Sequence, residues 1–171
     1  MELKKNLIIG LTGPAGCGKD TTKEILYDCF LGWSFNSYRF AKPLYDAVWA
    51  MFGWSYDELQ NREFKESISE YGFSPRVALQ TLGTEWGRNL NPNLSVQITK
   101  SQIIKSIEAR KKFDPNGFSV HVITDVRFEN EADILDSMNS QDTFSTVLHI
   151  EPKGEKFKTT KETSHASEAE I

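Results

Sequence analysis

The sequence predicts an α/β protein in which a parallel β-sheet carries helices on both faces. An apolar run at residues 7–11, typical of a strand buried on both faces, leads into a glycine-rich turn and an amphipathic helix. Strands and helices then alternate along the chain, which is the order of elements in a parallel α/β sheet. With 171 residues, 39% of them hydrophobic, residues 1–171 are expected to form a single soluble domain.

The first third of the chain is expected to contain two strands and two helices. The first helix covers residues 19–31, and its apolar positions are Ile25, Leu26, Cys29 and Phe30. A second strand follows at residues 34–40. The second helix begins after Lys42 and Pro43, and its apolar face is made of Leu44, Val48 and Met51.

Capping signals predict the helices in the middle of the chain. Ser55 and Glu58 have the spacing of a capping box, and Ser74 with Pro75 predicts the start of a helix that runs to about Trp86. A further helix ends before the turn at residues 114–117. Its apolar stripe consists of Val96, Ile103, Ile104 and Ile107.

Two more strands are expected near the end of the chain, at residues 120–123 and 145–150. The first of them ends in Thr124 and Asp125. The helix between these strands has the apolar positions Ala132, Ile134, Leu135 and Met138. Within the strands, His121 and His149 are expected to pack as neutral imidazoles. From Glu151 onward Lys, Glu, Thr and Ser dominate, so this tail is expected to be mobile or ordered only by a ligand.

Composition and charge exclude several classes of function. The sequence has no run near the roughly 18 apolar residues of a membrane span. With 20 Lys+Arg against 24 Asp+Glu, the formal charge of −4 argues against a sequence-independent grip on long nucleic acid. Two cysteines are too few for a disulfide framework, and the first residues lack the apolar region of a signal peptide. The chain is therefore expected to be cytoplasmic.

A phosphate-binding loop is the most specific motif in the chain. The letters G-P-A-G-C-G-K at residues 13–19 fit the pattern G-x-x-x-x-G-K, between the first strand and the first helix where that loop must lie. Glycines let the backbone N–H groups point at phosphate oxygens, the helix adds its positive end, and Lys19 is expected to reach the β- and γ-phosphates. The residues expected to bind the nucleotide are Gly13, Ala15, Gly16, Cys17, Gly18, Lys19, Asp20 and Thr21.

One position departs from the usual loop, because Asp20 stands where Ser or Thr normally follows the lysine. Either the Asp20 carboxylate or the Thr21 hydroxyl would then serve Mg²⁺. A ligand-free glycine turn rarely combines three glycines with a lysine at this spacing. The G-x-G-x-x-G dinucleotide spacing is not satisfied, and no N-K-x-D motif of a GTPase follows.

Several blocks together resemble the bacteriophage deoxynucleoside monophosphate kinases, relatives of the adenylate-kinase-like P-loop kinases. The blocks are G-K-D-T at 18–21, F-A-K-P-L at 40–44, S-P-R at 74–76, L-Q-T-L-G-T-E-W-G-R at 79–88, I-T-D-V-R-F-E-N-E at 123–131 and H-A-S-E at 165–168. The resemblance implies a three-layer P-loop kinase fold with an acceptor-binding helical insertion at about 42–112 and a lid-like segment at about 151–168. Family members usually continue into a last strand and helix, which this sequence, ending at Ile171, is expected to lack.

The resemblance and the position of residues in the expected fold also imply roles. The catalytic residues are expected to be Lys19, Asp20, Asp125 and Arg127, and those around Mg²⁺ to be Asp20, Thr21 and Asp125, directly or through water. The acceptor is expected to be bound by Lys42, Arg76, Gln80, Glu85, Trp86 and Arg88, and the lid to include His165, Ser167 and Glu168. Aromatic candidates for stacking on a base are Phe40, Tyr71 and Trp86.

The expected reaction is transfer of the γ-phosphoryl group of ATP, with Mg²⁺, to a deoxynucleoside monophosphate, which gives the diphosphate and ADP. Two alternatives remain open: a P-loop kinase for another small phosphorylated acceptor, and a nucleotide-binding regulator without turnover. The expected partners are small nucleotides, with no membrane and no long nucleic acid, in the host cytoplasm if the chain is of phage origin. A homodimer is left open.

Overall fold

The computed structural model describes residues 4–151, and the chain divides into two compact units. The first, called the sheet unit, comprises residues 4–39 and 98–151. The second, called the helical unit, is Phe40–Gln97. The tail expected to act as a lid, with His165, Ser167 and Glu168, lies from residue 152 onward outside the described residues.

A four-stranded, all-parallel sheet forms the centre of the sheet unit. Its strands are β1 (Asn6–Thr12), β2 (Ser34–Tyr38), β3 (Ser119–Ile123) and β4 (Thr143–His149), in the order β2-β3-β1-β4. All four strands expected from the sequence are confirmed, with ends that shift by one or two residues. β1 and β3 are the central pair, which explains why their sequences are the most apolar.

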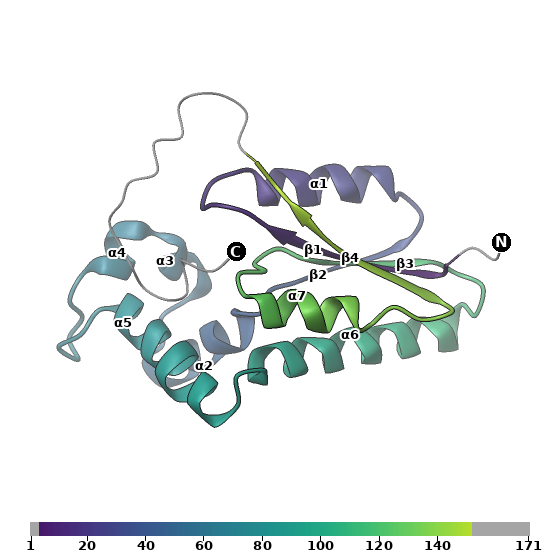
Figure 1. Cartoon of the computed structure of the whole chain (residues 1–171). Helices are drawn as coiled ribbons and strands as arrows, with labels where there is room; N and C mark the ends of the chain where they lie inside the picture. Colours follow the sequence, from purple (N-terminus) through teal and green to yellow (C-terminus); the bar gives the residue numbers. More distant parts are fainter. Residues whose placement is uncertain (1–3, 152–171) are drawn as a thin grey trace. The chain divides into compact units, whose positions relative to one another are not determined.

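Helices cover both faces of this sheet, as expected (Figure 1). On one face, Ile9, Leu11, Val120 and Val122 form a core under α1 (Lys19–Cys29), which is reached by Leu26 and by Phe30 just beyond its end. On the other face lie α6 (Leu94–Phe113) and α7 (Glu129–Asp136). A Cβ at Gly10 would lie only 2.7 Å from Cδ1 of Leu135, so glycine here lets α7 approach β1 closely.

Polar side chains are buried between the sheet and α6. Asn6 accepts hydrogen bonds from Ser119 Oγ and Arg110 Nη2, both at 2.9 Å. His121 lies 3.0 Å from Ser119 Oγ and 3.2 Å from the Tyr38 hydroxyl. Burial, followed by the nearby positive charge of Arg110, lowers the pKa of His121 to about 4. His121 is therefore neutral at physiological pH, as expected, whereas His149 is exposed near the end of β4 and was wrongly expected to be packed.

In three helices, the stripe of residues that packs on the core is narrower than the predicted apolar face. In α1, Leu26 and Phe30 pack on the sheet, while Ile25 is 57% exposed and Cys29 is exposed too. In α2 (Lys42–Phe52), Phe52 packs in the core with the buried Val48, at a spacing of four, and Met51 is 61% exposed.

The stripe of α6 differs from the prediction in the same way. Val96, Thr99 and Ile103 are buried at spacings of three and four, and Ile104 is 40% exposed. Thr99 is polar, so a pattern of apolar residues does not indicate that its position is buried.

Short helices build the helical unit. They are α2, α3 (Tyr56–Gln60), α4 (Arg62–Glu66), α5 (Pro75–Gln80) and the π-helix η1 (Thr81–Arg88). Val48, Trp54, Leu59 and Ala78 form the core. The predicted caps are confirmed, since Ser55 with Glu58 forms a reciprocal capping box on α3 and the Ser74 hydroxyl accepts from the Val77 N–H on α5. Within residues 4–151, no helix is both long and apolar enough to cross a membrane.

Candidate active site

The candidate site lies where the strands of the sheet unit end. Because β1 and β3 are parallel neighbours, the loop after β1 and the segment after β3 emerge at the same edge, where open α/β sheets bind ligands. Backbone hydrogen bonds join the segments at this edge to β1: Val126 N–H, after β3, donates to Leu11 O at 3.2 Å, and Ile150 N–H, after β4, donates to Thr12 O at 2.8 Å. These hydrogen bonds hold the backbone in place at the base of the site.

The loop between β1 and α1 has the backbone shape that its glycines permit. Gly13 has φ of +135°, and a Cβ there would overlap the carbonyl oxygen of Ile150. Gly18 has φ of +103° and directly precedes α1, with no side chain capping the helix. The first N–H groups of α1 have no partners within the helix, so this end of α1 carries a partial positive charge that suits a phosphate.

Lys19, the first residue of α1, turns its ammonium group back onto the loop. Nζ donates to the carbonyl oxygens of Gly13 at 2.6 Å and Pro14 at 2.8 Å. It also lies 3.7 Å from Sγ of Cys17, whose side chain is buried under the loop. The ammonium group of Lys19 therefore lies against the backbone of the loop.

Asp20, the departure from the usual motif, is paired with a residue that the sequence analysis did not single out. Its Oδ1 lies 3.2 Å from Nη2 of Arg39, which directly follows β2. The Asp20 side chain is 67% exposed, and Thr21 is exposed as well. A contact between residues 20 and 39 depends on the order of the strands, so no local motif could have indicated Arg39.

The segment after β3 carries the other two expected catalytic residues. Thr124, Val126 and Phe128 are buried, whereas Asp125 is half-buried and Arg127 is exposed. Burial thus alternates along this segment. Asp125 and Arg127 therefore share the side away from the core, while their neighbours hold the segment down.

Glu131 is a second residue of this site to which the sequence analysis gave no role. It is only 4% exposed, and its Oε2 accepts hydrogen bonds from the N–H groups of Arg127 at 2.7 Å and Phe128 at 3.1 Å. The spacing of three residues between Phe128 and Glu131 is that of a helix-capping glutamate. The sequence contains this spacing, but Phe128 stands at the N-cap position where a capping box usually has Ser or Thr.

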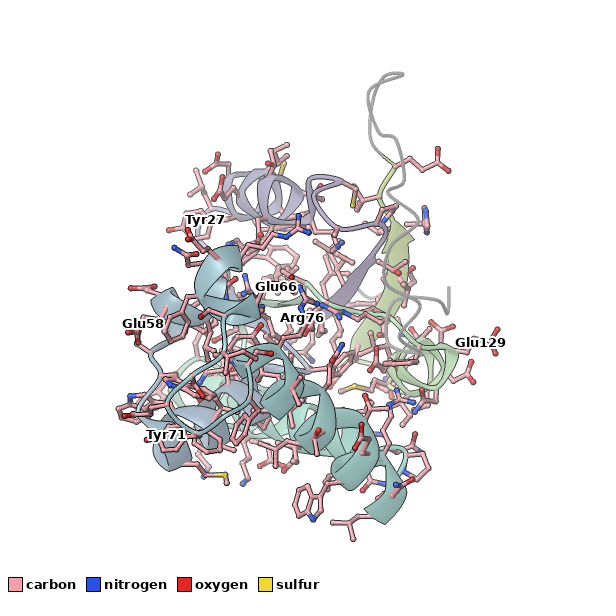
Figure 2. The ribbon with its side chains drawn as sticks, turned by 90° about the vertical axis from the view of Figure 1, so that its left-hand side faces the viewer. Tyr27, Glu58, Glu66, Tyr71, Arg76 and Glu129 are labelled. Atoms are coloured by element: carbon pink, nitrogen blue, oxygen red, sulfur yellow. The ribbon has the colours of Figure 1, made fainter. Side chains whose placement is uncertain are left out.

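In the helical unit, Arg76 is held by an acidic partner. Its Nη2 lies 2.8 Å from Oε1 of Glu66, and the two side chains face each other (Figure 2). Arg62 also approaches Glu66, at 3.8 Å, but its side chain is 91% exposed against 28% for Arg76. Arg76 is thus the more fixed and more enclosed of the two guanidinium groups.

The other expected acceptor-binding residues lie mostly on the helix that continues from α5. Gln80 ends α5 and is half-buried; Trp86 on η1 is 55% exposed, with Glu85 exposed beside it and Arg88 half-buried at its end. The predicted helix from Pro75 is confirmed in extent, but its second half has π geometry. Such π segments are rare and occur often at functional sites.

Three further candidates have other surroundings. Lys42 forms an ion pair with Asp46 at 2.8 Å on the exposed side of α2. Phe40 is only 3% exposed, and Tyr71 packs against Trp54 and Phe73 with ring centroids 5.9 and 6.3 Å away. Phe40 is thus buried, whereas Tyr71 packs against neighbouring rings but is still 47% exposed. Trp86, at 55%, is the most exposed of the three candidates for base stacking.

The arrangement fits Mg²⁺ of the kind that accompanies nucleotides. Among residues 4–151, no three His, Cys, Asp or Glu side chains gather as a metal cluster. Mg²⁺ in phosphoryl-transfer sites usually takes one or two protein oxygens and completes its shell with phosphate oxygens and water. Asp20 and Thr21 in the first turn of α1, and Asp125 after β3, are oxygen donors of that type.

Together the sheet and its loop define a P-loop kinase fold, in which a parallel sheet presents a phosphate-binding loop after its first strand. No model of a known protein family matches the chain. Two curated relatives do. The deoxynucleoside-5'-monophosphate kinase of Escherichia phage T5 is 26% identical over an alignment of 229 positions, which covers 97% of this chain and 85% of the relative. A provisionally named deoxynucleotide monophosphate kinase of Acanthamoeba polyphaga mimivirus is 32% identical over 134 residues, 75% of this chain and 68% of the relative. The chain belongs to the deoxynucleoside monophosphate kinase family.

Proposed function

We propose that this protein transfers the γ-phosphoryl group of ATP to the phosphate of a deoxynucleoside monophosphate. The observation that carries the proposal is the glycine-rich loop before α1, onto whose carbonyl oxygens Lys19 donates. Asp125 and Arg127 follow β3 at the same edge of the sheet. The family supplies the acceptor, because both curated relatives are named for deoxynucleoside or deoxynucleotide monophosphates.

The reaction needs positioning and charge neutralisation more than proton transfer. An oxygen of the acceptor phosphate attacks the γ-phosphorus, and the bond from that phosphorus to the β–γ bridging oxygen breaks, so that ADP leaves. The attacking oxygen is already ionised, so no strong general base is required. The loop N–H groups and Lys19 bind the phosphates of ATP, and Arg127 stabilises the charge on the transferring group.

Asp20, Thr21 and Asp125 are proposed to hold Mg²⁺, which when bound neutralises charge on the nucleotide phosphates. Arg76 and Arg88 are proposed to bind the acceptor phosphate, for which the planar guanidinium group is suited. Gln80, Glu85 and Trp86 are proposed to contact the base, and Lys42 to assist in binding the acceptor. These assignments are supported by the exposure of Trp86 and by the enclosed, fixed position of Arg76.

The test is a coupled assay of ADP release with ATP, Mg²⁺ and each of the four deoxynucleoside monophosphates in turn. The expected result is ADP production that depends on at least one of them, with formation of the matching diphosphate. K19A serves as the control for contaminating kinases. Turnover with a small non-nucleotide phosphate acceptor alone, or tight ATP binding without turnover on any acceptor, would contradict the proposal.

A further inference from the structure

We propose that Glu131 is the positioning residue for Arg127: its buried carboxylate fixes the backbone from which Arg127 extends into the site. The inference rests on the proposed function, in which Arg127 stabilises the transferring phosphoryl group. It assigns a role to a residue that touches no nucleotide and acts through another side chain.

The contact itself is specific. One carboxylate oxygen, Oε2, accepts both the Arg127 N–H at 2.7 Å and the Phe128 N–H at 3.1 Å. Glu131 is 4% exposed, so in the folded protein these bonds are shielded from bulk water. Both N–H groups converge on the same oxygen, and Glu131 lies in the first turn of α7, a position where acidic side chains are favoured by the helix end.

Glu131 is itself fixed to the sheet. It lies in α7, where Leu135, one turn further on, is 1% exposed and packs at Gly10 of β1. The carboxylate is therefore held by a helix that is anchored on the same strand that leads into the phosphate-binding loop. A shift of α7 away from β1 would move the Glu131 oxygen from the two N–H groups.

Arg127 depends on such anchors because its own side chain is exposed. On its N-terminal side, Val126 is 2% exposed and donates its N–H to Leu11. On its C-terminal side the anchors are Phe128, 8% exposed, and the Glu131 carboxylate. Without Glu131, the N–H of Arg127 would lose its partner and the direction of the side chain would no longer be set on that side.

The experiment compares E131A with a matched control, E129A. Glu129 lies in the first turn of the same helix with the same charge, but it is exposed and extends away from α7 (Figure 2). E131A is expected to lower kcat roughly 10- to 100-fold, because small misplacements of a catalytic group have effects of that size. KM for ATP is expected to stay within about twofold, and E129A to behave as wild type. E131Q, whose amide oxygen still accepts the two N–H bonds, is expected to recover most of the lost kcat.

A double mutant separates a positioning role from a structural one. If Glu131 acts through Arg127, adding E131A to R127A causes no further loss of kcat. A full additional loss in the double mutant, or a lowered Tm with normal kcat of the folded protein, overturns the inference. Should E131A fail to fold, E131D takes its place, since it keeps the charge but withdraws the oxygen from the N–H groups.

Amide hydrogen exchange gives a readout that does not depend on activity. In the wild-type protein without nucleotide, the amides of Arg127 and Phe128 are expected to be protected, and E131A or E131D to speed their exchange while E129A does not. Unchanged exchange overturns the inference. If no deoxynucleoside monophosphate is phosphorylated, the proposed function fails, while the exchange experiment still decides whether Glu131 fixes this segment.

Discussion

The guanidinium group of Arg39 lies 3.2 Å from the carboxylate of Asp20, so the end of β2 and the first turn of α1 are joined by an ion pair beside the phosphate-binding loop. Asp20 is the acidic residue that replaces the usual Ser or Thr, and an unpaired acid here would repel nucleotide phosphates. The pair offsets that charge. Because both side chains are substantially exposed, its contribution to stability is expected to be below about 1 kcal/mol.

Substitutions at this ion pair and at Thr21 can decide whether Asp20 or Thr21 binds Mg²⁺. If Asp20 serves Mg²⁺, D20N raises the Mg²⁺ concentration needed for half-maximal turnover, and R39Q lowers it because the competing positive charge is gone. T21V then stays near wild type. The measurement is turnover against free Mg²⁺ at fixed ATP. A larger shift in T21V than in D20N assigns the role to Thr21.

Lys19 is expected to be essential for turnover and dispensable for the fold. K19A should reduce kcat by about 100-fold or more, because it removes a charge that stabilises the transferring group, while Tm changes little. K23A, one turn further along α1, is the control and should keep wild-type turnover. Near-normal kcat in K19A would remove the loop from the mechanism.

Asp125 is expected to act through its charge. D125N preserves the shape of the side chain, so it should weaken the response of turnover to Mg²⁺ with little loss of thermal stability. D133N, an exposed acid on α7, is the matched control. If D125N lowers Tm but its folded fraction keeps wild-type Mg²⁺ dependence, then Asp125 has a structural role.

Arg76 and Arg62 provide a matched pair in the helical unit, since both approach Glu66 but differ in exposure. R76Q is expected to raise KM for the acceptor about tenfold or more, the cost of losing a charged partner of a phosphate. R62Q should leave that KM unchanged. Initial rates at varied acceptor and saturating ATP measure the difference, and equal effects of the two variants would contradict a role for Arg76 in acceptor binding.

The buried His121 predicts how stability depends on pH. Its pKa is about 4 in the folded protein and about 6.5 when unfolded, so the unfolded chain binds the proton more readily. The stabilisation is fully present above pH 6.5 and is lost as the pH falls from there toward 4, by up to about 3 kcal/mol. Urea unfolding at pH 7.5 and 4.5 measures this loss.

His149 is the control, because it is exposed on β4. H149Q should show the same loss of stability with acid as wild type, whereas H121Q should show a smaller one, although it starts from a lower stability. Equal pH dependence in H121Q and wild type would mean that other groups, such as carboxylates, account for the whole effect.

The fold was largely predictable because its signals are local. The central strands β1 and β3 are short, mainly apolar runs, and the helix starts at Ser55 and Ser74 depend on side chains that bond to the backbone three residues on. The positions of Asp125 and Arg127 followed from one rule, that ligands bind where parallel strands end. These features need no knowledge of distant contacts.

What the sequence did not indicate depends on contacts between distant segments or on small differences in hydrogen bonding. The Arg39 pair requires the strand order β2-β3-β1-β4. Burial of Glu131 requires α7 to pack at Gly10. A π-helix differs from an α-helix in the carbonyl to which each N–H donates. The composition of Thr81–Arg88 does not distinguish the two geometries.

The alternation of buried and outward residues between Thr124 and Phe128 has a consequence for how this region can change over generations. At the outward positions, Asp125 and Arg127, substitution is restricted by their proposed roles in the reaction more than by packing. Insertion or deletion of a single residue reverses the alternation for every residue on one side of the change; directly before Asp125, it would turn an acid and an arginine toward the core. In related chains this stretch should therefore keep its length.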